Sequence, residues 1–302
     1  MNDITYIDRA SGKEHIEKVY GKALIEALYG SSSLSKILSF LFLPLLSRSN
    51  LISFLWCAFQ KSRFSQFKIK PFIKAFHVDS SEFRDSVDSF RCFNDFFIRH
   101  LKPSARPINP DVKRAILPAD ARYLVYSNIA SIDGFWVKGH KFSLEELLLS
   151  QALAKKYAAG SMVIARLAPV DYHRFHFPIS CTSETPLSIP GKLYSVNPTA
   201  LKKDIDILTR NKRMLTTLHS DNFGDVTYIE VGATNVGSIH QTFQPGKQHA
   251  KGEEKGYFSF GGSCLILLFE PGKIQFDKDL LNASSRKIEV LGRLGQSLGT
   301  LF

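Results

Sequence analysis

The chain has 302 residues, of which 44% are hydrophobic, and its 39 Lys and Arg exceed its 28 Asp and Glu by eleven charges. That composition is enough for one sizeable core or two smaller ones, and the positive charge favours an anionic partner, either a membrane or nucleic acid. The cysteines have no paired spacing, which argues against a disulfide framework and favours a reducing compartment. They are Cys57, Cys92, Cys181 and Cys264.

The first 105 residues are predicted to be mainly helical. The polar start, Met-Asn-Asp-Ile-Thr, lacks the apolar core of a signal peptide. Apolar residues recur at helical spacing from Lys13 to Tyr29, before Gly30, and again from Ser80 to Arg99. We therefore expect residues 1–105 to form a helical N-terminal region.

Two short apolar runs within residues 34–60 predict membrane contact. Ile37 to Ser47 and Ser49 to Gln60 contain no charged residue, but each is little over half of the ~20 residues that a spanning helix needs. With Lys and Arg on both sides, they indicate a broken amphipathic pair lying in the bilayer interface. A buried helical hairpin is the alternative. The side chains expected to enter the interface include Leu41, Phe42, Phe54 and Trp56.

Residues 106–302 are predicted to form a β-rich core, because short β-branched and aromatic runs alternate there with Gly and Pro. One helix is expected from Leu144 to Tyr157, with Ser143 as its N-cap and Glu146 three residues on. The predicted class is α+β, with a helical membrane-facing N-terminal part and a mostly antiparallel β core, sandwich-like or barrel-like. The expected strands include Tyr123–Tyr126, Ser161–Leu167, Thr227–Val231 and Leu265–Phe269.

Two segments carry candidate acid and base groups. Asp120 follows a proline in Leu-Pro-Ala-Asp-Ala-Arg, where a lone Asp is usually a turn former. His173 and His176 lie three residues apart in Asp-Tyr-His-Arg-Phe-His-Phe-Pro, and two imidazoles this close supply proton transfer near neutral pH. A zinc pair is the alternative, but the neighbouring Phe and Pro residues favour a strand or turn over the helix such a pair needs.

The run Gly261-Gly262-Ser263 lies between two strand-like segments and predicts a place where the backbone can cut itself. Gly262 lacks a Cβ, so the Ser263 hydroxyl can approach the preceding carbonyl and convert the amide into an ester. Elimination from that ester would free Gly262 as a new C-terminus and turn residue 263 into a pyruvoyl group. A tight hairpin that happens to contain a serine is the alternative.

A second serine motif, Gly295-Gln-Ser-Leu-Gly299, matches the nucleophile elbow of α/β-hydrolases. Those enzymes place their Asp and His after the serine, and only three residues follow here. The match is interpreted as coincidence.

Four motifs occur in order along the chain. They are Arg91 to Pro103 with Ala105-Arg-Pro107, the Asp-Tyr-His-Arg-Phe-His segment, Val231 to Ile239, and Lys251 to Phe258 leading into Ser263. Together they resemble the pyruvoyl-dependent, self-processing phosphatidylserine decarboxylases. Two departures stand beside the reacting groups, since Ala121 replaces the family's usual Gly and Cys264 its common Thr.

The resemblance implies that cleavage between Gly262 and Ser263 makes a covalent pyruvoyl cofactor, which forms a Schiff base with phosphatidylserine and yields phosphatidylethanolamine and CO2. It implies that Asp120 and His176 assist self-cleavage and that His173 lies beside the substrate. The two cleaved chains are expected to stay associated, and the enzyme to be a homo-oligomer or a monomer. It is expected to lie peripherally on the cytoplasmic face of a bacterial cell membrane and to bind no nucleic acid.

Two other functions remain open at this point. A metal-dependent phospholipid hydrolase would use His173 and His176 with Asp171 or Asp120, and chelator would abolish it. A basic peripheral membrane-binding protein would bind lipid with Ser263 unprocessed.

Overall fold

The computed structural model describes residues 4–18, 58–131, 136–137, 140–141, 143–201, 204, 206–233, 238–261 and 263–302. The predicted cleavage residue Gly262 lies outside these residues. So do Leu41, Phe42, Phe54 and Trp56 and nearly all of the predicted interfacial segment.

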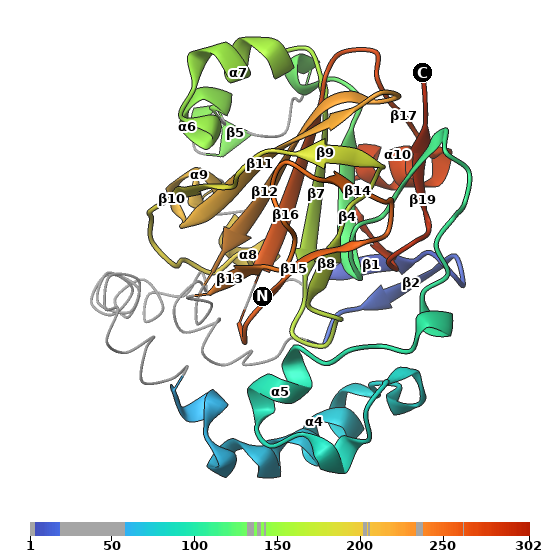
Figure 1. Ribbon diagram of the computed structural model, residues 1–302, viewed down its shortest axis with the longest axis vertical. Helices are drawn as coiled ribbons and strands as arrows, with labels where there is room; N and C mark the ends of the chain where they lie inside the picture. Colours follow the sequence, from blue (N-terminus) through green and yellow to red (C-terminus); the bar gives the residue numbers. More distant parts are fainter. Residues whose placement is uncertain are drawn as a thin grey trace.

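One large, mostly antiparallel sheet forms the centre of the structure (Figure 1). Among the described residues its two end strands do not pair with each other, so the sheet is open and the predicted barrel alternative is wrong. The α+β class with a mostly antiparallel sheet is confirmed. In order across the sheet the strands are β14 (Gln248–His249), β9 (Cys181–Ser183), β11 (Arg213–Ser220), β12 (Gly224–Gly232), β16 (Ser263–Phe269), β7 (Ser161–Leu167), β4 (Ala121–Tyr126), β18 (Glu289–Gly292), β1 (Thr5–Asp8) and β2 (Lys13–Ile16), while β10 (Leu187–Ile189) pairs with β11.

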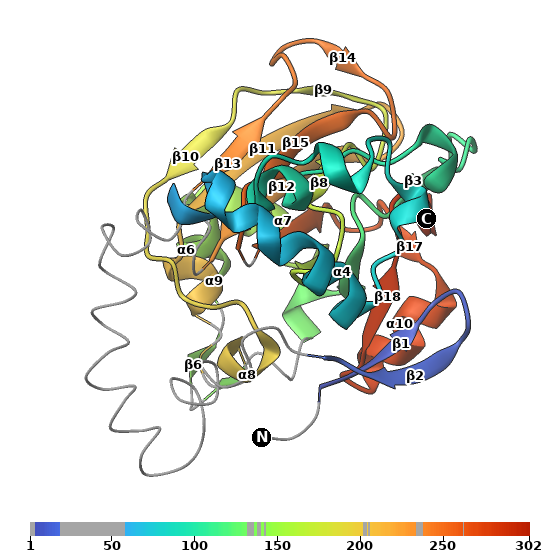
Figure 2. The same ribbon diagram turned by 90° about the horizontal axis from the view of Figure 1, so that it is seen from below.

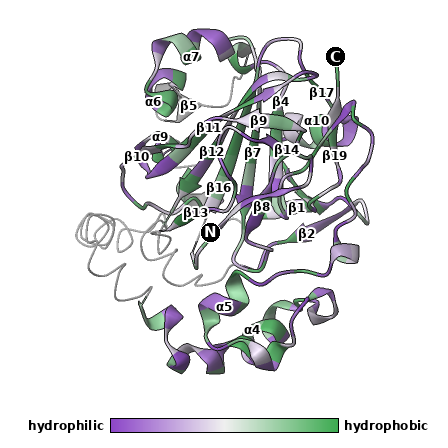
Figure 3. Ribbon diagram, viewed as in Figure 1, coloured by the Kyte–Doolittle hydropathy of each residue, from purple (hydrophilic) through white to green (hydrophobic). Residues whose placement is uncertain are grey.

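The predicted core strands are confirmed, and β16 is central among them. All seven of its residues are buried, which is typical of a strand covered on both faces. It pairs antiparallel with β12 on one side and β7 on the other. Figure 3 colours these central strands mainly as hydrophobic.

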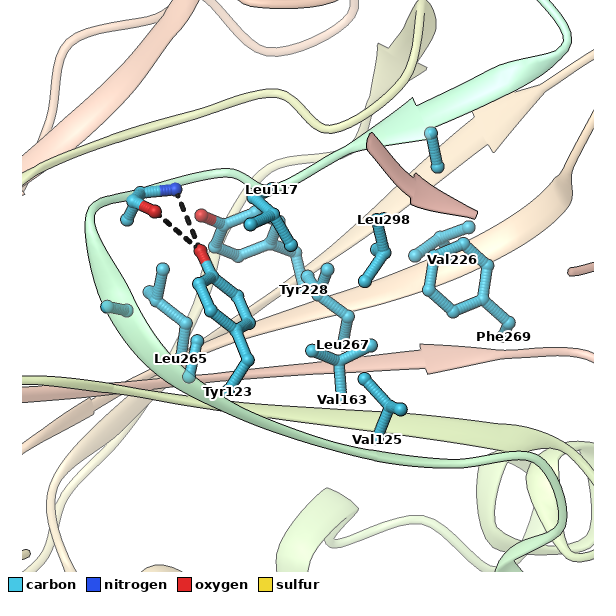
Figure 4. Packing of buried hydrophobic residues seen from close by; sticks show 14 of the residues in the cluster. Leu117, Tyr123, Val125, Val163, Val226, Tyr228, Leu265, Leu267, Phe269 and Leu298 are labelled. Atoms are coloured by element: carbon cyan, nitrogen blue, oxygen red, sulfur yellow. Dashed lines mark hydrogen bonds between the residues drawn. The ribbon is translucent and has the colours of Figure 1, made fainter. Parts of the chain in front are cut away.

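Alternate residues of β16 enter two different cores. Leu265, Leu267 and Phe269 face one side of the sheet, where Figure 4 shows them packed with Tyr123 and Tyr228. Smaller sheets and a helix cover this side. They are β13 (Ile239–Gln241), β15 (Glu254–Phe258) and β8 (Arg174–His176), then β17 (Gln275–Phe276), β19 (Ser297–Thr300) and β3 (Arg114–Ile116), and α10 (Lys278–Ser285).

The opposite side takes Cys264, Ile266 and Leu268, which pack against short helices. The helix predicted from Leu144 to Tyr157 is in fact two, because Leu149 ends the first in a left-handed conformation with φ of 50°. The Ser143 cap is confirmed, since its Oγ accepts the Glu146 N–H at 3.2 Å. The elements near this side are α6 (Leu144–Leu148), α7 (Gln151–Tyr157), α8 (Pro198–Leu201), α9 (Ile207–Arg210) and the hairpin of β5 (Trp136–Val137) and β6 (His140–Lys141).

The N-terminal residues depart from the prediction of helix. Lys13–Ile16 form β2, which pairs with β1, and β1 joins the core sheet alongside β18. Helical spacing misleads here because a two-stranded hairpin at a sheet edge is mostly exposed and its sequence need not alternate. The region predicted as mainly helical therefore also contributes two strands to the large sheet.

Residues 58–105 form a small helical layer, called here the helical module. In Figure 1 it lies below the lower ends of the central strands, and Figure 2 views the molecule from that side. Its own core consists mainly of phenylalanines, to which Phe260 of the main domain is added. Ser80–Arg99 is broken into two 3₁₀ turns and one short helix rather than the single predicted helix. The elements are η1 (Arg63–Lys68), α4 (Ile69–Phe76), η2 (Ser80–Glu82), η3 (Val87–Ser89), α5 (Phe93–Phe97) and η4 (Pro103–Ala105).

No helix in the described part of the chain is both long and apolar enough to span a bilayer. The Gly295–Gly299 motif is no strand-to-helix elbow, because Ser297 begins β19 and its carbonyl accepts a bond from Arg9.

Candidate active site

Ser263 opens β16 and is completely buried. Its neighbours across the sheet are Leu167 and Gly232. Two residues earlier, Gly261 has a φ of +142°, a backbone conformation that is essentially restricted to glycine. The turn before Ser263 therefore requires glycine at position 261, whereas Gly262, on which the prediction rested, lies outside the described residues.

His173 touches Ser263 from the covering layer. Its Nε2 lies 2.9 Å from the carbonyl oxygen of Ala168, and its Nδ1 lies 3.3 Å from Ser263 Oγ. A carbonyl oxygen can only accept, so Nε2 carries the ring proton and Nδ1 presents a lone pair to the serine hydroxyl. This arrangement prepares His173 to take a proton from Ser263 or to return one to residue 263.

The neutral form of His173 is enforced by its surroundings. The ring is fully buried, and burial together with the nearby Arg99 charge holds its pKa well below the usual value. Phe97 stacks on the imidazole with ring centroids 3.8 Å apart. A neutral imidazole is the form that can act as a base at neutral pH.

The loop before His173 is fixed by a buried ion pair. Asp171 binds Arg122 of β4 and accepts the Ala168 N–H at 2.6 Å, so it sets the position of the carbonyl that orients His173. Burial of Asp171 outweighs the attraction of Arg122 and raises the pKa of the carboxyl. In this structure Asp171 is therefore a loop anchor, rather than the metal ligand of the hydrolase alternative.

Asp120 lies at a neighbouring turn that is also tightly held. Tyr123 exchanges two hydrogen bonds with Ala119 through its hydroxyl group (Figure 4). The Asp120 carboxylate accepts bonds from Arg106, at 2.6 Å for the shortest, and from the Leu294 N–H. Both bonds hold the carboxylate in place.

His176 lies on β8, one position after Phe175, which points into the core beside the large sheet. Successive side chains of a strand point to opposite sides, so His176 faces away from that core. Its ring is buried, and this burial lowers the pKa of the imidazole to about 4. Its Nδ1 has no hydrogen-bond partner among the described residues.

The structure therefore brings together two of the four predicted catalytic residues, Ser263 and His173. Within the described residues, neither Asp120 nor His176 makes a hydrogen bond to Ser263. Cys264, which stands where the family commonly has Thr, directs its side chain into the core on the opposite side of the sheet and so away from His173. No three His, Cys, Asp or Glu side chains in the described part of the chain gather as metal ligands.

Three further residues, Asn94, Phe97 and Arg99, contribute to the site but could not be identified from the sequence. Asn94 and Arg99 hold backbone on either side of the Ser263–His173 pair, and Phe97 covers the imidazole. The only sequence signal is that they lie in one of the four motifs, the segment 91–103. The spacing of that motif does not reveal which side chains reach the site.

The buried His176 predicts acid sensitivity. Between about pH 6.5 and about 4 the unfolded chain binds a proton at this position that the folded chain does not, so the free energy of unfolding falls as the pH falls. The loss is about 3 kcal/mol at pH 4 from this group. Urea unfolding at pH 7 and pH 4.5 should show a smaller decline for His176→Gln than for wild type. An equal decline in both proteins would contradict this account.

Comparisons with known proteins cover most of the chain. The family model described as phosphatidylserine decarboxylase matches residues 93–300. A phosphatidylserine decarboxylase proenzyme of Chlamydia trachomatis serovar D is 49% identical over 247 residues, which are 82% of this chain and 81% of the relative. Proenzymes of the same name from Chlamydia caviae and Chlamydia pneumoniae are 47% and 45% identical over 299 residues, covering 99% of this chain and 98% of each relative.

Proposed function

Because this chain belongs to the phosphatidylserine decarboxylase family, we propose that it is a proenzyme whose self-cleaved form converts phosphatidylserine into phosphatidylethanolamine and CO2. The observation that carries the proposal is the contact of Ser263 with His173 directly after the Gly-Gly turn. This contact places an imidazole that can exchange a proton beside residue 263, and both the processing of the serine and the later decarboxylation need proton transfer there.

Self-cleavage would proceed in three steps. Ser263 Oγ loses its proton and bonds to the carbonyl carbon of residue 262, the C–N bond breaks, and the amide becomes an ester with a free amine on residue 263. Loss of the Ser263 α-proton then breaks the Cβ–O bond, which gives a carboxylate on residue 262 and dehydroalanine at 263. Its imine tautomer adds water and releases ammonia, leaving a pyruvoyl group.

The residues around Ser263 fit such a group. A ketone at this position would lie where Ser263 lies now, in a dry site beside His173 and between β7 and β12. The group would supply an electrophile that binds the substrate amine and accepts the electrons left when CO2 departs. His173, whose Nδ1 carries a lone pair and is directed at residue 263, would first take up a proton at Nδ1 and then pass it to the α-carbon of the substrate.

The cleaved chains would stay together because the sheet joins them. Seven residues of β16 pair with β12 and the same seven with β7, both of which precede the cleavage point. Further pairs join β18 to β4 and β19 to β3. The fragment 263–302 is therefore built into the structure of fragment 1–262.

The activity is tested by incubating the purified protein with vesicles that contain phosphatidylserine. Phosphatidylethanolamine and CO2 should form in equal amounts, and EDTA should leave the rate unchanged, because the electron sink is made from the chain itself. Release of phosphate, fatty acid or headgroup that stops with EDTA would instead support the metal-dependent hydrolase.

Membrane docking is the second part of the proposal. The two most exposed aromatic side chains of the helical module are Phe64 at 81% and Phe67 at 72%. They line one surface pocket with Arg63, Lys70 and Asp88, and Asp88 pairs with Lys70 at 2.7 Å. Apolar side chains beside a cation such as Arg63 are typical of an interfacial surface. We propose that this surface, together with the apolar runs of residues 37–60 that precede it in the sequence, holds the enzyme peripherally on the cytoplasmic face of the membrane.

Replacing Phe64 and Phe67 together by Ser should weaken binding to anionic vesicles, since two aromatic side chains lose their burial in the interface. Binding should also fall with salt, because each Lys or Arg near the surface contributes roughly 1 kcal/mol. Vesicle co-sedimentation measures both. Phe302→Ser is the control, because Phe302 is equally exposed, at 85%, but lies outside the helical module. Equal binding of the double variant and the control would refute docking through this surface.

A further inference from the structure

The short segment 93–99 contacts the candidate active site on both of its sides. It belongs to the helical module, whereas Ser263 and His173 belong to the sheets of the main domain. Two of its side chains bind backbone groups of the main domain, and each of these contacts lies next to one member of the Ser263–His173 pair.

Asn94 holds the strand end that leads to the cleavage point. Its Oδ1 accepts the Phe260 N–H at 2.9 Å, and both residues are buried. Phe260 is packed edge-on against Phe93 and Phe97, with centroids 5.2 and 5.0 Å away. The backbone is thus fixed three residues before Ser263, at the start of the turn that Gly261 completes.

Arg99 holds the loop that carries His173. Its Nη2 donates to the carbonyl oxygens of Val170 and Asp171 at 3.2 and 3.3 Å. The guanidinium is buried and, among the described residues, pairs with no carboxylate within ion-pair distance. Burial without such a partner lowers its pKa to about 10. A charge buried in this way costs free energy, which the bonds of Arg99 to the loop carbonyls must offset.

We propose that Asn94 and Arg99 are positioning residues that align the turn before Ser263 with His173, so that self-cleavage depends on docking of the helical module. This inference rests on the proposed function. The attack needs the hydroxyl and the carbonyl held in register, and a misplacement of about 1 Å costs roughly 10²-fold in rate. Neither residue touches the reacting atoms, so each acts only through the backbone that it holds.

The two residues act on different stages. The Asn94 contact lies on the N-terminal side of the cleavage point and orders the precursor turn, so its loss should slow cleavage and leave the cleaved enzyme nearly intact. Arg99 orders the loop of His173, which serves before and after cleavage. Its loss should therefore slow both processes.

The experiment follows conversion to two chains by intact mass over time, and the decarboxylation rate per pyruvoyl group. Asn94→Leu should convert at least about 10-fold more slowly, with a per-pyruvoyl rate within about 3-fold of wild type. Asn94→Asp, which keeps an oxygen acceptor in place, should convert faster than Asn94→Leu. Arg99→Met should slow both conversion and decarboxylation, and Arg99→Lys should partly restore them.

Two variants serve as matched controls. Asn222→Leu and Arg91→Met remove the same groups from exposed positions away from the Ser263–His173 pair and should behave as wild type. Unfolding midpoints separate a general loss of stability from misalignment, because a merely structural role would give Asn94→Asp and Asn94→Leu conversion rates that follow stability alone.

Wild-type conversion rates in both Asn94→Leu and Arg99→Met would overturn the positioning role while leaving the proposed function standing. An equal loss in Asn94→Leu and Asn94→Asp at equal stability would also overturn the role of the Asn94 contact. If Asn94→Leu does not fold, Asn94→Ala decides in the same way. A wild-type chain that never cleaves would overturn the proposed function, and this inference with it.

Discussion

Ser263→Ala should remain a single 302-residue chain without decarboxylase activity. Without the Oγ there is no nucleophile for the backbone carbonyl, no ester and no elimination, so residue 263 keeps its backbone nitrogen and no ketone forms. Wild-type protein should instead give residues 1–262 and a fragment of about 40 residues, 263–302, that begins with a pyruvoyl group. Intact mass spectrometry distinguishes these products without an activity assay.

Ser259→Ala is the control for this experiment. Ser259 is also buried and also contacts a histidine, since its Oγ lies 3.1 Å from His240 Nε2, but it lies four residues before the cleavage point. The Ser259→Ala chain should still be cut after residue 262. A wild-type chain that decarboxylates phosphatidylserine while remaining uncut would refute the self-processing mechanism altogether.

His173→Ala should lose most decarboxylation, by about 10²–10⁴-fold per pyruvoyl group, because the proton donor beside residue 263 is removed. Its cleavage should be affected much less in extent. Cleavage happens once per chain, so even a greatly slowed reaction reaches completion during expression and purification, whereas decarboxylation needs the group in every turnover. The fraction cleaved and the rate of phosphatidylethanolamine formation should be measured on the same preparation.

His176→Ala and Asp120→Asn provide the contrast. The resemblance implies that these two residues serve cleavage, and the buried Nδ1 of His176 has no hydrogen-bond partner in the described part of the chain. Both variants should therefore accumulate precursor. If His173→Ala alone remains uncut, the contact seen between His173 and Ser263 is the one that activates the serine, and this division of roles is wrong.

The strands of the core could be predicted from the sequence because their residues are buried on both faces. Runs such as Leu265–Phe269 contain apolar residues at every position, and tertiary packing reinforces what the local sequence already favours. The strand or turn expected at His173 and His176 was predictable for a similar reason, since the adjoining Phe and Pro residues disfavour a helix.

The helical regions were less predictable because long-range contacts decide them. Lys13–Ile16 has helical spacing but takes up a hairpin because β1 can pair with β18, whose sequence lies more than 270 residues away. The break at Leu149 depends on one backbone conformation. Neither the pairing of β1 with β18 nor the conformation of Leu149 can be read from the neighbouring residues alone.

Within the site, the sequence identifies reacting groups but not their partners. Ser263 and His173 could be named from motifs because their chemistry is distinctive. Their pairing could not, nor could the roles of the Ala168 carbonyl, Asp171 and Arg99, because backbone acceptors and buried ion pairs exist only once the layers have packed.

The burial of Ser263 between two strands has a consequence for when the electrophile is made. Its neighbours on β7 and β12 are in place only after the sheet has formed. A nascent, truncated or misfolded chain would therefore keep an ordinary serine, and no reactive ketone would meet the amines of the surrounding cell. Maturation would then be limited to folded chains, and the reactive ketone would form only inside a chain that already encloses it.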